Sequence, residues 1–323
     1  MAADNEGGGR RFVLALGGNA LIPAGQAGTW DEQLVITGET MEQVARLAAD
    51  GHRVVLTHGN GPVVGNIILR GDAGMAIHGI PAMPMFVCGA DSQGGLGFLL
   101  QQSLQNELHK IGLVKPVAAV VTQVRVDRAD PAFGSPTKPI GPFYTQEEAA
   151  RLMEETGWTI VEDAGRGWRR VVPSPKPVEI VEWEAIKALN EAGVLTIAAG
   201  GGGVPVLKDD AGMLAGVDAV IDKDRASALL AGLIGADVLV IITQVDRVYA
   251  NYGTPEEEAL DVLGTERAAA MLAAGEFPAG SMGPKIESAL TFIAQGGDEV
   301  VITSPEHILA AIEGRQGTRI VAG

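Results

Sequence analysis

The stretch Phe12-Val13-Leu14-Ala15-Leu16-Gly17-Gly18 decides the fold class, because an apolar run that stops at paired glycines is typical of a buried strand entering a tight turn. A second run of this kind, Val54 to Thr57, stops at His58-Gly59-Asn60-Gly61. Between them, residues 39–49 place apolar side chains at helical spacing and end at Asp50-Gly51, which predicts a helix. The opening unit is therefore predicted as strand, helix, strand.

The same alternation returns along the chain. Further strands are predicted at residues 117–122, 194–199, 238–243 and 299–303, separated by helices rich in Ala and Leu. Strands that alternate with helices form a largely parallel sheet with right-handed connections. We therefore predict an α/β fold, a three-layer sandwich whose mainly parallel central sheet is covered by helices on both faces. This domain is expected to span residues 11–323, after a disordered N-terminal tail at residues 1–10.

Residues 125–177 interrupt this rhythm with seven prolines and interleaved charged and aromatic residues. A long surface loop would have this composition, but structureless loops of such length are uncommon in compact domains. We therefore predict an inserted, protruding subdomain at about residues 125–177 that could act as a lid. Within it, Trp168-Arg169-Arg170-Val171-Val172 is predicted as a strand of a hairpin.

The formal net charge is −16, which would repel a polyanion. Because nucleic-acid binding depends on neutralising backbone phosphates, DNA and RNA are not expected as partners. Cys88 is the only cysteine, and its apolar neighbours favour a packing role over a nucleophilic one. The start of the chain lacks an apolar signal region, and no segment offers about 18 uninterrupted apolar residues. We expect a cytoplasmic protein without membrane association.

Four glycine-rich segments are predicted as turns after apolar strands: Gly17-Gly18-Asn19, Gly59-Asn60-Gly61, residues 89–97 and residues 200–203. Such turns lie beyond the carboxyl ends of the strands, where backbone N–H groups can approach an anion. One turn alone more often only reverses the chain, but four together predict a phosphate cradle. The Gly-x-x-x-x-Gly-Lys-Ser/Thr loop is absent and the Gly-x-Gly-x-x-Gly pattern fails at Val64, so P-loop and dinucleotide sites are disfavoured.

Three lysines stand in surroundings unlike those of an ordinary solvated lysine. Lys138 lies among prolines, Lys223 lies between two aspartates, and Lys285 starts a predicted helix, where its charge opposes the helix dipole. Glycine amides and lysines with few candidate general bases indicate phosphoryl transfer, which depends on positioning and charge stabilisation. His58 could be catalytic or could orient the turn that follows it, and the sequence favours neither role.

These motifs resemble the amino-acid kinase superfamily and, within it, the carbamate kinases. The resemblance covers nearly the whole chain and is carried by residues 16–21, 58–62, 130–133, 136–143, 168–175, 199–204, 219–224, 245–249 and 280–285. The segments around Lys138 and Trp168 discriminate best, because they lie in the inserted subdomain that resembles that of carbamate kinases. Related acylphosphate-forming kinases usually carry a lysine two residues before the first Gly-Gly, where this chain has Ala15.

The resemblance implies reversible phosphoryl transfer between carbamoyl phosphate plus ADP and carbamate plus ATP, run toward ATP synthesis in arginine or purine-derivative breakdown. It also implies Mg²⁺ with the nucleotide, no predicted side-chain metal ligands, and a homodimer. Lys138, Lys223 and Lys285 would neutralise charge, and Asp224 would orient Lys223. The phosphoryl and carbamoyl groups would be held by Gly17, Gly18, Asn19, Gly59, Asn60 and Gly61, and the nucleotide by Thr243, Asp246, Tyr249, Gly280, Ser281 and Met282.

Two positions depart from the pattern expected of the family. Val63 stands where a glutamine often follows the Gly-Asn-Gly-Pro turn, and Gln244 stands where an acidic or small residue is common. Two alternatives stay open. Another small-carboxylate kinase would need a pocket for a larger side chain, and a nucleotide-binding regulator without turnover would not need the complete set of three lysines and Asp224.

Overall fold

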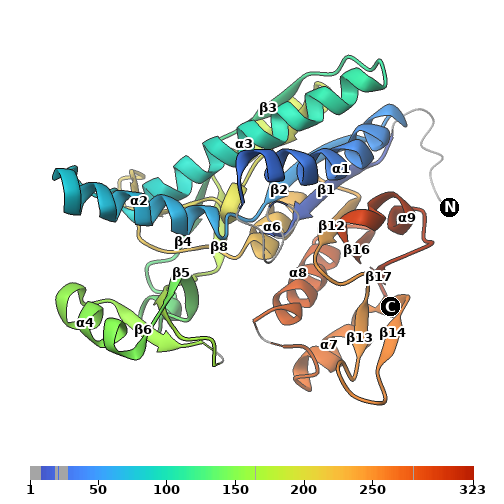
Figure 1. The fold of residues 1–323 in the computed structure, drawn as a ribbon. Helices are drawn as coiled ribbons and strands as arrows, with labels where there is room; N and C mark the ends of the chain where they lie inside the picture. The colour runs from blue at the N-terminus through green and yellow to red at the C-terminus, as the bar shows by residue number, and fades with distance from the viewer. Residues whose placement is uncertain (1–8, 19–20, 22–27, 164, 279) are drawn as a thin grey trace.

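The computed structural model describes residues 9–18, 21, 28–163, 165–278 and 280–323. An eight-stranded sheet lies at its centre (Figure 1). In spatial order its strands are β15 (Val262–Gly264), β17 (Thr318–Val321), β16 (Glu299–Thr303), β12 (Val238–Ile242), β1 (Arg11–Leu16), β2 (Arg53–His58), β9 (Leu195–Ile197) and β3 (Val117–Ala119). Neighbouring strands pair in parallel except β16 with β17, so the predicted mainly parallel sheet is confirmed.

Successive residues of the central strands face opposite sides of this sheet, and both sides are apolar. In β1, Val13 belongs to one cluster of buried side chains and Leu14 to the other. The first cluster includes residues of α5 (Trp183–Glu191), α6 (Lys223–Ile234), α7 (Thr265–Ala273) and α8 (Met282–Ala294), and the second includes residues of α1 (Trp30–Ala49), α3 (Met85–Lys110) and α9 (Ile308–Ile312). The predicted three-layer sandwich is therefore confirmed.

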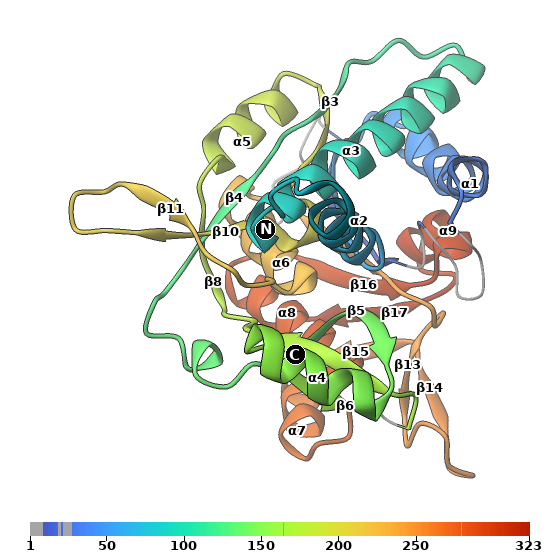
Figure 2. The same cartoon turned by 60° about the vertical axis from the view of Figure 1, so that its left-hand side comes forward.

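Several predicted elements have different boundaries in the structure: the strand predicted at residues 194–199 spans Leu195–Ile197, and the strand predicted at residues 238–243 ends at Ile242. The helix predicted at residues 39–49 begins at Trp30, because the Thr29 hydroxyl accepts the Glu32 N–H at 3.4 Å and the Glu32 carboxylate accepts the Thr29 N–H at 2.8 Å. The strand predicted at residues 117–122 ends at Ala119. The chain then enters a four-stranded sheet in the order β11 (Leu214–Gly216), β10 (Val204–Lys208), β4 (Gln123–Val126) and β8 (Pro177–Ile180), whose β10–β11 hairpin extends outward in Figure 2.

The glycine turn predicted at residues 89–97 is wrong, because these residues lie inside helix α3. Glycines lower helix propensity, but packing on a neighbour overrides that preference here. A methyl group on Gly97 would lie 3.0 Å from the Ala119 Cβ atom, so this face of α3 approaches β3 closely. The helix before it, α2 (Val63–His78), packs on α3 and follows the glycine turn after β2.

Residues 138–172 form a separate three-stranded antiparallel sheet, which we call the small-sheet segment. Its strands are β5 (Lys138–Tyr144), β7 (Trp168–Val172) and β6 (Thr159–Glu162) in spatial order, with α4 (Gln146–Thr156) between β5 and β6 along the chain. Figure 1 shows it set apart from the large sheet. The strand predicted at Trp168–Val172 is confirmed, and it forms a hairpin with β6. The ends of the predicted segment 125–177 instead join the four-stranded sheet, through β4 and β8.

The remaining elements are short. A hairpin of β13 (Val248–Ala250) and β14 (Glu258–Leu260) follows β12, and single 3₁₀ turns lie at Pro131–Phe133, Gly200–Gly202 and Pro305–His307. Of the tail predicted at residues 1–10, residues 1–8 lie outside the described residues, whereas the Arg10 guanidinium donates to Glu299 at 2.8 Å. No helix in the described ranges is long and apolar enough to cross a membrane.

Candidate active site

The glycine turns after β1 and β2 pack backbone against backbone at the carboxyl ends of the strands. The Gly17 N–H donates to the Ile242 carbonyl at 3.1 Å, and the Gly59 N–H donates to the Leu16 carbonyl at 2.9 Å. A methyl group on Gly18 would lie 2.7 Å from the Gly61 carbonyl oxygen, so only glycine fits there. The predicted meeting of these two turns is therefore observed, while Asn19 lies outside the described residues.

A third glycine turn, residues 200–203, supports the turn after β2 from behind. Gly201, Gly202 and Gly203 have φ values of 65°, 87° and 92°, a region that favours glycine. A methyl group on Gly201 would collide with the side chain of Asn60, whose amide also donates to the Ser92 hydroxyl at 3.3 Å. Three of the four predicted glycine segments thus converge, and residues 200–203 pack under Asn60.

His58 is buried beneath the same turn. Its Nδ1 atom lies 2.8 Å from the Gly59 carbonyl, so Nδ1 must carry the proton and donate it. Burial, with a smaller contribution from the nearby Lys223 ammonium, lowers the pKa of His58 to about 4, although the hydrogen bond to Gly59 acts in the opposite direction. A neutral, buried imidazole bonded to the turn fits the orienting role better than a catalytic one.

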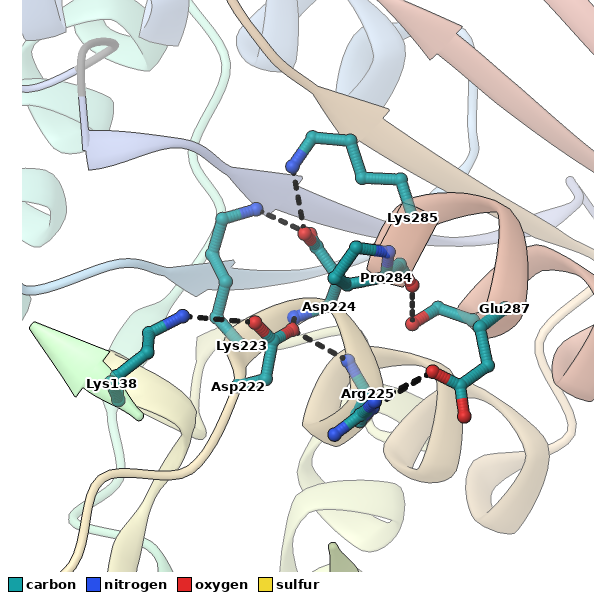
Figure 3. Close-up of polar contacts among 9 residues, drawn as sticks. Lys138, Asp222, Lys223, Asp224, Arg225, Pro284, Lys285 and Glu287 are labelled. Carbon is teal, nitrogen blue, oxygen red and sulfur yellow. Dashed lines mark hydrogen bonds and ion pairs between the residues drawn. The ribbon is translucent and has the colours of Figure 1, made fainter. Parts of the chain in front are cut away.

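Two of the three predicted lysines share one buried carboxylate. Lys223, the first residue of α6, places Nζ 2.6 Å from Asp224 Oδ1, and Lys285 of α8 places Nζ 2.9 Å from Asp224 Oδ2 (Figure 3). Burial by itself would raise the pKa of Asp224, but the two ammonium groups outweigh it and hold that pKa below its usual range. Two cations and one anion leave a surplus positive charge next to the glycine turns.

Lys223 also reaches back toward β1. Its Nζ donates to the Ala15 carbonyl at 3.3 Å, which puts an ammonium group beside the position where related kinases carry a lysine. Its Cδ atom would lie 3.6 Å from a methyl group on Gly59. Lys223 therefore contacts both the end of β1 and the glycine turn after β2.

Lys138 comes from a different part of the molecule. It begins β5 of the small-sheet segment, and its Nζ donates to Asp222 Oδ2 at 3.2 Å. Asp222 was not predicted as a site residue, although its place directly before the first residue of α6 is a typical N-cap signal. Figure 3 shows Lys138 of β5 and Lys285 of α8 reaching the carboxylates at the start of α6, where Lys223 also lies.

Two cavities flank this cluster. The first, of about 260 Å³, lies between the turn after β2, α2 and the small-sheet segment, and its lining includes Asn60, Gly61, Lys138 and Arg169. Arg169 was not predicted either: one of its terminal nitrogens donates to the Gly141 carbonyl at 3.1 Å, and its buried Nε has no partner among the described residues. Of the residues predicted to hold the phosphoryl and carbamoyl groups, Asn60 and Gly61 line this cavity, whereas Gly17, Gly18 and Gly59 do not.

The second cavity, of about 240 Å³, carries most of the predicted nucleotide residues. Thr243, Tyr249, Ser281 and Met282 line it together with Lys285. Asp246 is not in its lining, but it accepts the Tyr249 hydroxyl at 2.8 Å and this bond raises the pKa of Tyr249. Gly280 does not line it, whereas the aromatic side chains of Tyr252 and Phe277, which were not predicted, do. Lys285 thus faces the second cavity and Lys138 the first.

No group of three or more His, Cys, Asp or Glu side chains that could hold a metal ion occurs among the described residues. Asp222 and Asp224, the carboxylates closest to the lysines, each accept from an ammonium group. The site therefore contains cationic side chains and backbone amides that can bind an anion.

Comparisons with known proteins agree with these features. Residues 10–304 match the model of the amino acid kinase family. The chain is 50% identical to the carbamate kinase of Pyrococcus horikoshii, with 96% of this chain and 98% of that protein covered, and 49% identical to that of Staphylococcus epidermidis, with 96% and 99% covered. The structure of a carbamate kinase from Giardia lamblia bound to AMP-PNP superposes with a TM-score of 0.91 at 42% identity, covering 98% of this chain and 99% of that one. The chain therefore belongs to the amino acid kinase family and, within it, to the carbamate kinases.

Proposed function

We propose that the protein transfers a phosphoryl group between carbamoyl phosphate and ADP, giving carbamate and ATP, and that it also runs the reverse reaction. The buried pair Lys223 and Lys285, which shares a single carboxylate, carries this proposal, because it leaves a surplus positive charge beside a cradle of glycine backbone. Kinship with carbamate kinases at about half sequence identity over nearly the whole chain supports the same choice of substrates.

Phosphoryl transfer to carbamate needs little acid–base chemistry. Carbamate is already an anion, so one of its oxygens forms the new bond to the γ-phosphorus of ATP while the bond to the bridging oxygen of ADP breaks, and no proton has to leave. The barrier comes mainly from repulsion between anions and from alignment. A site with three lysines and a neutral His58 suits that task.

Each of the two cavities would bind one of the two substrates. Carbamoyl phosphate would occupy the first, where Asn60 and Gly61 face Lys138 and Arg169. The nucleotide would occupy the second, between Tyr249 and Met282, and direct its phosphates toward Lys285. Lys223 and Asp224 would then lie where the two phosphates meet, with the backbone of Gly17, Gly18 and Gly59 against the transferring group.

Magnesium fits this site as a companion of the nucleotide. Among the described residues, no group of three or more acidic, His or Cys side chains could enclose the ion. At kinase sites Mg²⁺ is held largely by substrate phosphates with one or two carboxylates. When bound, it would supply further neutralisation of phosphate charge. Asp224, which lies between Lys223 and Lys285, is the nearest candidate for a contact to it or to its waters.

The small-sheet segment would act as a lid and as a distinct subdomain. It carries Lys138 and Arg169 to the first cavity, and its apolar contact with the rest of the molecule is small, with Ile140 and Val172 packed against Met85, Ile68 and Val220. A segment held by few apolar contacts can move at modest cost. Its closure would exclude water from the reacting groups.

Further proposals follow from the family. The strip formed by Met75, Ile77, Ile80 and Met83 at the end of α2 and in the segment after it is exposed and apolar, which suits burial in a homodimer. Light scattering would test the homodimer.

We place the protein in the cytoplasm, where it would make ATP from carbamoyl phosphate in arginine or purine-derivative breakdown.

The test of the proposed function is direct. Purified protein mixed with Mg-ADP and carbamoyl phosphate should form ATP, and mixed with Mg-ATP and carbamate it should form ADP. Acetyl phosphate and acylphosphates of amino acids, offered in place of carbamoyl phosphate, should support much slower turnover. ATP formation no faster than in the control without enzyme would contradict the proposal, and faster turnover with a larger acylphosphate would favour the other small-carboxylate kinases.

A further inference from the structure

The Asp222 side chain serves two partners with its two oxygens. Oδ1 accepts the backbone N–H groups of Asp224 at 2.9 Å and of Arg225 at 3.4 Å, which caps α6. Oδ2 accepts the Lys138 ammonium at 3.2 Å (Figure 3). The same carboxylate therefore joins the start of α6 to the first residue of β5.

Capping alone does not account for a charged residue at this position. Asn and Ser cap helices about as well as Asp. Asp222 lies beside a site for anionic substrates, and its charge by itself opposes such ligands. The charge is explained by the oxygen that does not cap, which faces Lys138.

Lys138 depends on this contact for its position. Its side chain is 39% exposed, and among the described residues Asp222 is its one ion-pair partner. Lys223 and Lys285 are each 13% exposed and are fixed by Asp224. A long ammonium side chain at a half-open surface would otherwise sample several rotamers.

We propose that Asp222 is a positioning residue, which holds Lys138 against the first cavity so that the ammonium meets the transferring phosphoryl group in a productive geometry. Because Asp222 also caps the helix that begins with Lys223 and Asp224, it fixes the lysine of the small-sheet segment relative to the buried pair. This role rests on the proposed function, since Lys138 is expected to contact the substrate.

Three substitutions separate the two roles of Asp222. Asp222→Asn keeps an oxygen to cap α6 but turns an amide group toward the Lys138 ammonium. Asp222→Glu keeps the charge but is not a preferred cap, and Asp222→Ala loses both. If Asp222 only caps, kcat should stay near wild type in the Asn variant and fall in the Glu variant. Positioning predicts the opposite order, with kcat reduced roughly 10²-fold in the Asn variant and largely kept in the Glu variant. ADP affinity should not change in either.

A second readout does not depend on turnover. An N-hydroxysuccinimide ester labels lysine amines that are exposed and not held by a partner, and mass spectrometry reports the rate at each lysine. Loss of the carboxylate partner should release the half-exposed Lys138 side chain and make it react several-fold faster in Asp222→Asn than in wild type, with Asp222→Glu close to wild type. Lys110, an exposed lysine paired with Glu107 at 2.7 Å, should be labelled at one rate in all the proteins.

Glu179→Gln provides a matched control. It removes a carboxylate that pairs with Arg125 at 2.7 Å in the four-stranded sheet and lines neither cavity, so kcat and Lys138 labelling should stay at wild-type values. Equal labelling of Lys138 in wild type and Asp222→Asn would overturn the inference, as would faster labelling with unchanged kcat. Wild-type protein that forms no ATP would contradict the proposed function instead, and the labelling rates would still decide whether Asp222 holds Lys138.

Discussion

The large sheet and the small-sheet segment present their cations to the site in different ways. Lys223 and Lys285 project from helices that pack on the large sheet, and both reach the buried Asp224. Lys138 projects from the small-sheet segment and reaches the better exposed Asp222. If the two cavities bind the substrates as proposed, we expect the nucleotide side of the site to be fixed in advance and the acceptor side to be completed when the small-sheet segment takes its place.

Packing follows the same division. All five residues of β12 are buried between two large apolar clusters. The small-sheet segment instead makes its apolar contact with the rest of the molecule through one small cluster around Ile140. It also has cation–π contacts of its own, with the Arg170 guanidinium 4.1 Å from the Trp158 ring centroid. Substitutions on the large-sheet side should therefore cost stability and activity together, and substitutions on the small-sheet side should cost mainly activity.

Asp224→Asn should have the largest effect. It leaves two buried ammonium groups without a counter-charge, so we expect a loss of about 3–5 kcal/mol in the free energy of unfolding at neutral pH together with loss of turnover. The stability loss should shrink in alkaline solution, because burial lowers the pKa of Lys223 and lets it lose its proton there. Urea unfolding at two pH values measures this. Glu287→Gln, which breaks the more exposed pair with Arg225, should cost less than about 1 kcal/mol, and an equal cost for both variants would contradict the contrast.

Lys138→Ala should abolish turnover while leaving the fold intact. Removing a group that stabilises developing charge typically lowers kcat about 10²–10³-fold, whereas truncating a half-exposed side chain changes stability by about 0.5 kcal/mol or less. ADP affinity, measured by calorimetry, should stay nearly at its wild-type value because Lys138 lines only the first cavity. Lost ADP affinity would place Lys138 in the nucleotide site, and Lys110→Ala is a surface control that should leave both values unchanged.

The buried His58 on the large-sheet side should make the free energy of unfolding depend on pH between about 4 and 6.5. Its pKa falls from 6.5 to about 4 on folding, chiefly through burial, so between these values the unfolded chain binds the proton more readily. The contribution of His58 to the free energy of unfolding is therefore complete above about pH 6.5 and is lost as the pH falls toward 4. The total loss is about 3 kcal/mol. His58→Asn keeps a donor toward Gly59 and should therefore unfold with a flatter pH profile than wild type. If the free energy of unfolding, measured in urea, varied with pH equally in His58→Asn and in wild type, His58 would not titrate in this way.

The sequence predicted the large sheet better than the small-sheet segment, for a physical reason. Strand ends such as Leu16 and Thr303 are marked locally, by apolar runs and by the residues that stop them. The start of α1 was also marked, by Thr29 and Glu32, and the prediction overlooked it. Which sheet β4 and β8 join depends on pairing between residues about fifty positions apart, for which the local sequence carries no signal.

The candidate site divides in the same way. Lys223, Asp224 and Lys285 could be selected from their neighbours in sequence, and the structure brings them together. Asp222 could have been found as a helix cap, but its contact with Lys138 joins residues 84 positions apart and depends on the fold. Arg169 is similar, because it faces the first cavity only through the pairing of β5 with β7.

The smallest expected effect provides the sharpest test of the comparison, because it uses the same substitution on both sides. Ile241→Val removes one buried methylene between the large sheet and its helices and should lower the free energy of unfolding by about 1 kcal/mol, with kinetic constants unchanged. Ile140→Val lies in the small cluster that seats the small-sheet segment and also lines the first cavity, so it should cost less stability but raise the KM for carbamoyl phosphate. The KM for ADP should not change in either variant. If Ile140→Val costs as much stability as Ile241→Val and leaves both KM values unchanged, the small-sheet segment is as firmly fixed as the large sheet, and the acceptor side of the site is preformed.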